Sequence, residues 1–125
     1  MLLVRTKLGP SPIHGTGVFA DEPVAAGQAI WEFAPGLDLV IPLERIPALP
    51  DAFQAYLNTY AYLSHDVGGG MVLSCDHAKF LNHSDAPNTV IAPRLTRARR
   101  DIAAGEEITC SYRECCVGWD GFHGA

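Results

Sequence analysis

One short segment concentrates side chains that can bind a ligand. Residues 80–88 begin with an apolar Phe-Leu pair and continue with Asn82, His83, Ser84 and Asn88. Burying two amides, an imidazole and a hydroxyl costs free energy unless each group has a hydrogen-bond partner. Two interpretations are open from the residues alone. The segment is a ligand site, or it is a set of Asx turns that cap two strands.

Two further segments carry weaker signals. His14–Ala20 places Gly15 and Gly17 around one threonine. Glycines let a backbone approach a ligand closely, although a glycine-rich hairpin turn explains the same residues. The segment is not a dinucleotide fingerprint, because no helix pattern follows it. Residues 105–112 form a turn and a predicted strand that ends in Tyr112, a place where a tyrosine usually serves packing.

The elements that must position these segments are mostly strands. Short apolar runs separated by proline and glycine predict a β-rich fold with many turns. Residues 49–60 predict a helix, because apolar side chains recur there every three to four residues, with Pro50 and Asp51 as its first residues. Residues 67–70 predict a flexible turn. The predicted strands are 2–7, 17–20, 29–33, 37–41, 71–74, 88–92, 94–101 and 107–112.

Composition restricts the class of protein. The chain has 125 residues, of which 48% are hydrophobic and 18% charged, as expected of one globular domain. The net charge of -5 disfavours a general nucleic-acid surface. No apolar run approaches the ~20 residues of a membrane span, and the N-terminus lacks the pattern of a secretory signal. We therefore expect a cytoplasmic protein, or one that reaches a host cell by a non-classical route.

The four cysteines predict no metal site. They are Cys75, Cys110, Cys115 and Cys116, and without a secretory signal we expect them to be reduced. Structural zinc sites need four ligands at suitable spacing, and the adjacent pair 115–116 does not provide it.

Together, the three segments resemble the SET-domain family of protein lysine methyltransferases. The resemblance rests on Gly-x-Gly-Val-Phe-Ala at 15–20, on Phe-Leu-Asn-His-Ser at 80–84 followed by Pro87-Asn88, and on Gly-Glu-Glu-Ile-Thr at 105–109 ending in Tyr112. It extends from about Leu3 to Tyr112 and is strongest with the small free-standing members of viruses and bacteria.

The resemblance implies a mostly β, β-clip SET fold. This fold has small curved sheets, one short inserted helix and a C-terminal pseudoknot. Residues 1–114 would be the SET domain and residues 115–125 a short tail without a zinc site. Many members have a zinc-binding cysteine directly after Asn-His-Ser, whereas this chain has Asp85. Another element must then close the lysine channel.

The resemblance also implies a cofactor, S-adenosylmethionine, and a set of site residues. Tyr112 would be the catalytic tyrosine and would also contact the cofactor. The other implied cofactor-binding residues are His14, Gly15, Thr16, Gly17, Tyr60, Lys79, Phe80, Asn82 and His83. The implied residues of the lysine channel are Tyr62, Cys110, Trp119 and Phe122.

The expected reaction is methyl transfer to a lysine side chain. The amine must lose its proton, and a dry aromatic channel favours the neutral form. The implied substrate is a basic protein such as a histone, which suits an acidic enzyme. The alternative is a non-catalytic binding module with the same fold. We expect no membrane or direct nucleic-acid partner, and a homodimer is possible because the domain is small.

Overall fold

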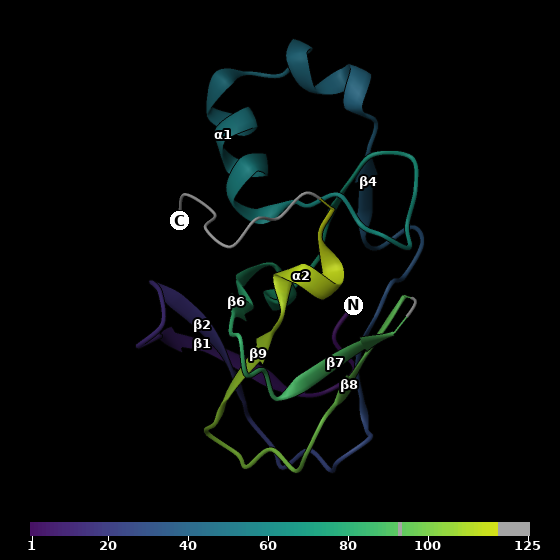
Figure 1. Cartoon of the computed structure of the whole chain (residues 1–125). Coiled ribbons are helices and arrows are strands. Elements are labelled where there is room, and N and C mark those ends of the chain that lie inside the picture. The colour runs from purple at the N-terminus through teal and green to yellow at the C-terminus, as the bar shows by residue number, and fades with distance from the viewer. Residues whose placement is uncertain (93, 118–125) are drawn as a thin grey trace.

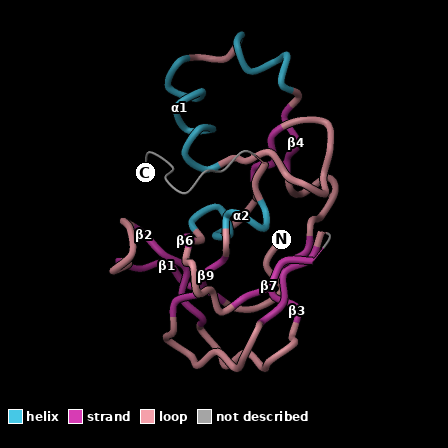
Figure 2. Tube along the Cα trace, in the orientation of Figure 1, coloured by secondary structure: helices cyan, strands magenta, loops and turns pink. Residues whose placement is uncertain are grey.

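The structure, a computed structural model, describes residues 1–92 and 94–117. Three small sheets form its frame, and helical segments cover one end of the molecule (Figure 1, Figure 2). The largest sheet has the strand order β1-β2-β9-β6. Its strands are β1 (Thr6–Pro10), β2 (Thr16–Ala20), β9 (Glu107–Cys110) and β6 (Asn82–His83).

The order of that sheet brings the three sequence segments together. β2 and β9 are antiparallel, with Val18 opposite Ile108. β6 runs parallel to β9 and places Asn82 opposite Thr109. The glycine segment, the Asn-His-Ser segment and the last strand are therefore three neighbouring strands of one sheet. The threading of the last segment through a loop stays a prediction.

The two smaller sheets complete the frame. One has the order β3-β8-β7, and the other pairs β4 with β5. All pairs in both are antiparallel. The strands are β3 (Ala29–Glu32), β8 (Leu95–Ala98), β7 (Thr89–Ala92), β4 (Leu39–Ile41) and β5 (Met71–Leu73).

The main core is aliphatic and joins the two larger sheets. Burying a valine or isoleucine side chain contributes roughly 1.5–3 kcal/mol each, so this cluster holds the frame on which the motifs are mounted. Its buried members come from β2, β3, β8 and β9, from the turns between strands and from the segment before β1. They are Val4, Ala20, Val24, Ile30, Ala98, Ile102 and Ile108.

The predicted helix forms as α1 (Asp51–Tyr60) and begins two residues later than expected. Leu49 is extended, with φ -82° and ψ 155°, because a residue before a proline avoids the helical region. Asp51 lies in the first turn, and no side chain caps the helix start. α1 fully buries one residue, Leu57, which packs with Ala61 and Leu73.

A mostly β fold built of small sheets is confirmed, and the differences concern short elements. β6 lies in a segment predicted as a loop, since its two residues extend only by pairing with β9. The first strand covers Thr6–Pro10 rather than 2–7, because Leu2 makes a single bridge to Trp31. Three short helices were not predicted. They are the 3-10 helices η1 (Leu43–Ala48) and η2 (His77–Phe80), and α2 (Tyr112–Cys115).

Candidate active site

A cavity of about 110 Å³ lies between the end of α1, the β7–β8 hairpin and α2. Its lining includes five of the residues singled out from the sequence. These are Tyr60, Tyr62, Lys79, Cys110 and Tyr112. The cavity therefore joins the end of the helix, the segment after it and the end of β9, which lie far apart in the sequence.

Tyr112 is held at both its backbone and its hydroxyl. Its backbone N–H donates to His83 Nδ1 at 3.0 Å, and its hydroxyl donates to the backbone carbonyl of Leu81. Burial, and then the thiol of Cys110, raise the pKa of Tyr112 well above its usual value. The hydroxyl is therefore protonated at neutral pH, so it serves as a hydrogen-bonding group and not as a phenolate base.

Tyr62 is fixed in the cavity wall by backbone pairing. It exchanges two hydrogen bonds with Val72, of 3.1 Å and 2.7 Å. Burial, followed by the charges of the nearby thiols, raises the pKa of Tyr62 far above its usual value. Two neutral tyrosines, Tyr62 and Tyr112, thus line one enclosed space.

Aromatic rings continue from the cavity along α1. Tyr60 meets Phe80 edge to face with ring centroids 5.2 Å apart, and it lies 4.7 Å from the ring of Tyr56. Lys79 Nζ donates to the hydroxyl of Tyr56 at 3.2 Å and lies 5.9 Å from the centroid of that ring. Phe80 therefore supports the wall from behind Tyr60, and the Lys79 ammonium is tied to α1.

Asn82 connects the glycine segment to the rest of the site. Its side-chain Nδ2 donates to the carbonyls of His14 (3.1 Å) and Thr16 (3.2 Å) and to Glu107 Oε2 (3.0 Å). Ser11 Oγ donates to the same carboxylate at 2.8 Å. The Asn82 amide is therefore committed to the protein, and its backbone is committed as well, because Asn82 pairs with β9 and its carbonyl accepts a hydrogen bond from the Cys110 thiol at 4.0 Å.

The glycine segment lies outside the cavity. His14, Gly15 and Thr16 are exposed, whereas Gly17 is buried on β2. Gly15 has φ +44°, and a Cβ there would meet nothing within 4 Å. The outer side of this turn is open, as a ligand-binding backbone requires. His83 also lies outside the lining, with its ring centroid 5.3 Å from that of Tyr112.

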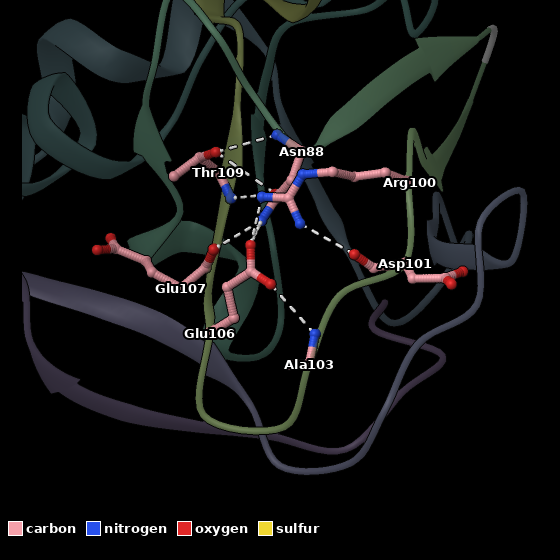
Figure 3. A network of polar contacts seen from close by, with 7 residues as sticks. All are labelled: Asn88, Arg100, Asp101, Ala103, Glu106, Glu107 and Thr109. Atoms are coloured by element: carbon pink, nitrogen blue, oxygen red, sulfur yellow. Dashed lines mark hydrogen bonds and ion pairs between the residues drawn. The ribbon is translucent and has the colours of Figure 1, made fainter.

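Asn88 anchors the strand that leads to Tyr112 (Figure 3). Its Oδ1 accepts from the Thr109 backbone N–H at 2.9 Å, and its Nδ2 donates to the Glu107 carbonyl at 2.8 Å. Arg100 pairs with Glu106 at the start of the same strand. The sequence left two interpretations open for the polar side chains of residues 80–88, a ligand site or a set of Asx turns. In the structure these side chains have different roles. Asn82 and Asn88 hold strands, and His83 holds Tyr112.

Three thiols meet at the cavity, although the sequence predicted only Cys110 there. Cys115 and Cys116 also line it, with their sulfurs 2.8 Å apart. Hydrogen bonds from the other two thiols lower the pKa of Cys115, and the same contact with Cys115 raises that of Cys110. Spacing along the sequence could not reveal this, because α2 folds back to place residue 115 against β9.

Trp31 is a further cavity residue, which the sequence assigned to the core. It is 92% buried, and among the described residues its indole Nε1 has no hydrogen-bond partner. β3 buries both Ile30 and Trp31, so burial on the strand fits both roles and only the neighbouring elements decide between them.

Three further sequence predictions concern two residues of the C-terminal tail, a metal site and a membrane span. Trp119 and Phe122 lie outside the described residues. Within residues 1–92 and 94–117, no three His, Cys, Asp or Glu side chains are grouped so as to hold a metal ion. No helix in that part of the chain is long and apolar enough to cross a membrane.

Comparison with known proteins identifies a family whose sequence pattern this chain matches. The family pattern described as SET domain matches residues 15–113. A Plasmodium falciparum protein described as a candidate histone methyltransferase has a similar structure, with a TM-score of 0.61 and 23% identity. The match covers 89% of this chain and 95% of that chain.

Polycomb Repressive Complex 2 of Chaetomium thermophilum is also similar. A humanized mutant bound to an inhibitor has a TM-score of 0.61 and 19% identity, and the apo complex in an autoinhibited state has 0.67 and 21%. Each match covers 92% of this chain and 16% of that chain. At these identities the likeness shows the fold. A search of curated proteins found no match.

Proposed function

The chain belongs to the SET-domain family, and from this premise we propose that it is an S-adenosylmethionine-dependent protein lysine N-methyltransferase. One observation carries the proposal. Tyr112, the tyrosine that ends the last motif, is held by His83 and Leu81 in the wall of a cavity that it shares with Tyr60 and Tyr62. The cavity combines enclosure, aromatic walls and a fixed hydroxyl.

Residues in and beside the cavity suit the cofactor. The aromatic side chain of Tyr60, supported by Phe80, offers flat apolar surface to a base, and aromatic faces also attract a cationic sulfonium. Beside the cavity, the open turn at 14–17, which Asn82 holds in place, offers backbone groups. When bound, the cofactor supplies an electrophilic methyl group.

The tyrosines prepare the amine that receives the methyl group. Burial beside aromatic walls disfavours an ammonium ion, so a lysine that enters the cavity is driven toward its neutral form. The Tyr112 hydroxyl donates a hydrogen bond to the Leu81 carbonyl. Its oxygen then acts as an acceptor toward an amine N–H, and such a hydrogen bond would orient the nitrogen lone pair for in-line attack.

Charge favours a basic protein substrate such as a histone. The chain carries a net charge of -5, whereas the cavity lining itself holds Asp66 together with the cations Lys79 and Arg94, so the attraction comes from the overall charge. A negative surface raises the local concentration of a cationic peptide. One of the similar solved structures is described as a candidate histone methyltransferase, which supports the same substrate class.

A transfer assay tests the proposal. The protein is mixed with S-adenosylmethionine labelled in its methyl group and with a panel of basic proteins that includes histones, beside Tyr112→Phe. Label on a protein, lost in the variant, supports the methyltransferase, and mass spectrometry then counts the methyl groups. Cofactor binding in calorimetry without transfer to any protein pool favours the non-catalytic module. Absence of both overturns the cofactor site.

A further inference from the structure

The loop after β6 is linked to α2 through Asp85. Asp85 Oδ1 accepts a hydrogen bond from His83 Nε2 at 3.0 Å and also pairs with Arg113. The Asp85 and Arg113 side chains are 77% and 55% exposed, whereas the His83 side chain is only 19% exposed. The carboxylate thus joins a buried ring to a helix that begins at Tyr112.

The direction of the hydrogen bonds defines the state of the His83 ring. The Tyr112 backbone N–H can only donate, so His83 Nδ1 must present its lone pair to it. The ring proton is then on Nε2 and is donated to Asp85. A carboxylate that orients an imidazole selects its tautomer and its ring plane. Asp85 therefore determines which nitrogen His83 turns toward Tyr112.

α2 is a short helix with further contacts at its C-terminal end, where Cys116 forms a single bridge with Ser64 and the Cys115 thiol meets that of Cys110. It has four residues, none of them is buried, and Ser111 gives it no side-chain cap. The first N–H groups of a helix have no partner within the helix, and His83 satisfies the first of them. Beyond the contacts of Tyr112 and Arg113, the Val117 N–H donates to the Leu63 carbonyl at 2.7 Å.

We propose that Asp85 and Arg113 form an ionic latch that positions Tyr112, acting through the ring of His83. This inference rests on the proposed methyl transfer for its catalytic consequence. Many members of the family have a zinc-binding cysteine at the position of Asp85, and here an ion pair connects the same loop to the segment after the catalytic tyrosine. An exposed ion pair adds little to global stability, so its effect lies in the position of Tyr112.

Two substitutions at Asp85 separate the parts of the latch. Asp85→Ala removes the acceptor for His83 and the partner of Arg113. Asp85→Asn keeps an oxygen for His83 but removes the charge that faces Arg113. Asp21→Ala is the matched control, because Asp21 is an exposed carboxylate paired with Lys7 at 3.7 Å on β1, away from α2. Both positions are exposed, so all three variants are expected to fold.

The first measurement does not need activity. Nitrogen-15 NMR of the wild-type ring is expected to show a proton on Nε2 of His83, and hydrogen exchange is expected to show a protected Tyr112 amide. Asp85→Ala should accelerate exchange at that amide and Asp85→Asn less so, whereas Asp21→Ala should leave it unchanged. A proton on Nδ1 in the wild type, or unchanged exchange in Asp85→Ala, overturns the latch.

The second measurement connects the latch to catalysis. With Asp85→Ala we expect kcat to fall about tenfold, as for loss of a group that orients a site residue, with KM for S-adenosylmethionine unchanged. Asp85→Glu should recover part of the loss. Faster amide exchange with an unchanged kcat overturns the catalytic part. Faster exchange in a protein that never transfers methyl groups overturns the proposed function and leaves the latch standing.

Discussion

The Tyr112 hydroxyl donates a hydrogen bond to the backbone carbonyl of Leu81, the residue directly before the Asn-His pair. His83, at the end of that pair, accepts from the backbone of the same tyrosine. Leu81 and His83, the residues on either side of Asn82, thus hold Tyr112 at two points. The parallel pairing of β6 with β9 makes this possible, because it brings residue 83 beside residue 110.

Tyr112→Phe is expected to separate catalysis from folding. The variant loses one hydrogen bond, which contributes about 1 kcal/mol net to the free energy of unfolding. Methyl transfer should fall roughly a hundredfold or more, because the hydroxyl that orients the amine is gone. Urea unfolding and the transfer assay measure the two effects. Tyr56→Phe is the control, since Tyr56 does not line the cavity and its hydroxyl accepts a hydrogen bond from Lys79. A loss of stability above ~3 kcal/mol would show that the hydroxyl is mainly structural.

Asn82→Ala is expected to loosen the glycine segment. The variant removes the donor to two backbone carbonyls and to Glu107, so we expect unfolding to become easier by about 2–3 kcal/mol. Hydrogen exchange should accelerate in residues 11–17. Asn58→Ala, on the exposed side of α1, is the control and should change little.

Asn82→Asp tests the same hydrogen bonds by placing a negative charge at residue 82. A carboxylate in place of the amide nitrogen would face Glu107 Oε2, now 3.0 Å away, and could no longer donate. We expect it to destabilise at least as much as Asn82→Ala at pH 7. The deficit should shrink as the pH falls toward about 4, because the Glu107 carboxylate raises the pKa of the new carboxyl and its protonated form can donate again. A deficit that does not change with pH would argue against this geometry.

Gly70→Ala is expected to disrupt the β4–β5 pair. A Cβ at Gly70 would lie 2.0 Å from the Ile41 carbonyl oxygen, which belongs to the backbone, and Gly70 has φ +146°. We expect a loss of about 2–4 kcal/mol in the free energy of unfolding. The control is Gly68→Ala, because a Cβ at Gly68 meets nothing within 4 Å. Thermal unfolding of the two variants should differ clearly, and equal melting temperatures would contradict the packing.

Glu106 is expected to make stability depend on acid pH. The hydrogen bond from Arg100 is the main cause that lowers the pKa of Glu106 from 4.5 to about 2, against a smaller opposing effect of burial. A carboxyl whose pKa is lower in the folded than in the unfolded protein stabilises the fold at pH values above its unfolded pKa. For Glu106 this contribution is lost as the pH falls from about 4.5 toward about 2.

Urea midpoints of the wild type and of Glu106→Gln measure that contribution. The gap between them should be widest near neutral pH, narrow below pH 4.5 and shrink in high salt, because the Arg100 side chain is 57% exposed. Glu44→Gln, on the exposed face of η1, should follow the wild type at every pH. A gap that stays constant down to pH 2 would contradict the pairing.

The amino-acid sequence alone determined the β-rich character, the position of α1 and the three motifs. These depend on local information: apolar periods, proline and glycine positions, and short residue patterns. It also selected five residues of the cavity, from Tyr60 to Tyr112, through resemblance to the SET family. The two-residue shift at Leu49 shows the same local dependence, since proline restricts the residue before it.

Only the tertiary structure decided what the polar residues of the motifs do. Asn82 reaches His14 across 68 residues and Asn88 reaches Thr109 across 21, and no local pattern encodes such partners. β6 is extended only because β9 lies beside it. Cys115 enters the cavity because α2 turns back from β9. Hydrogen bonds between distant segments must satisfy buried polar groups, and these pairings become visible only when the strands are assembled.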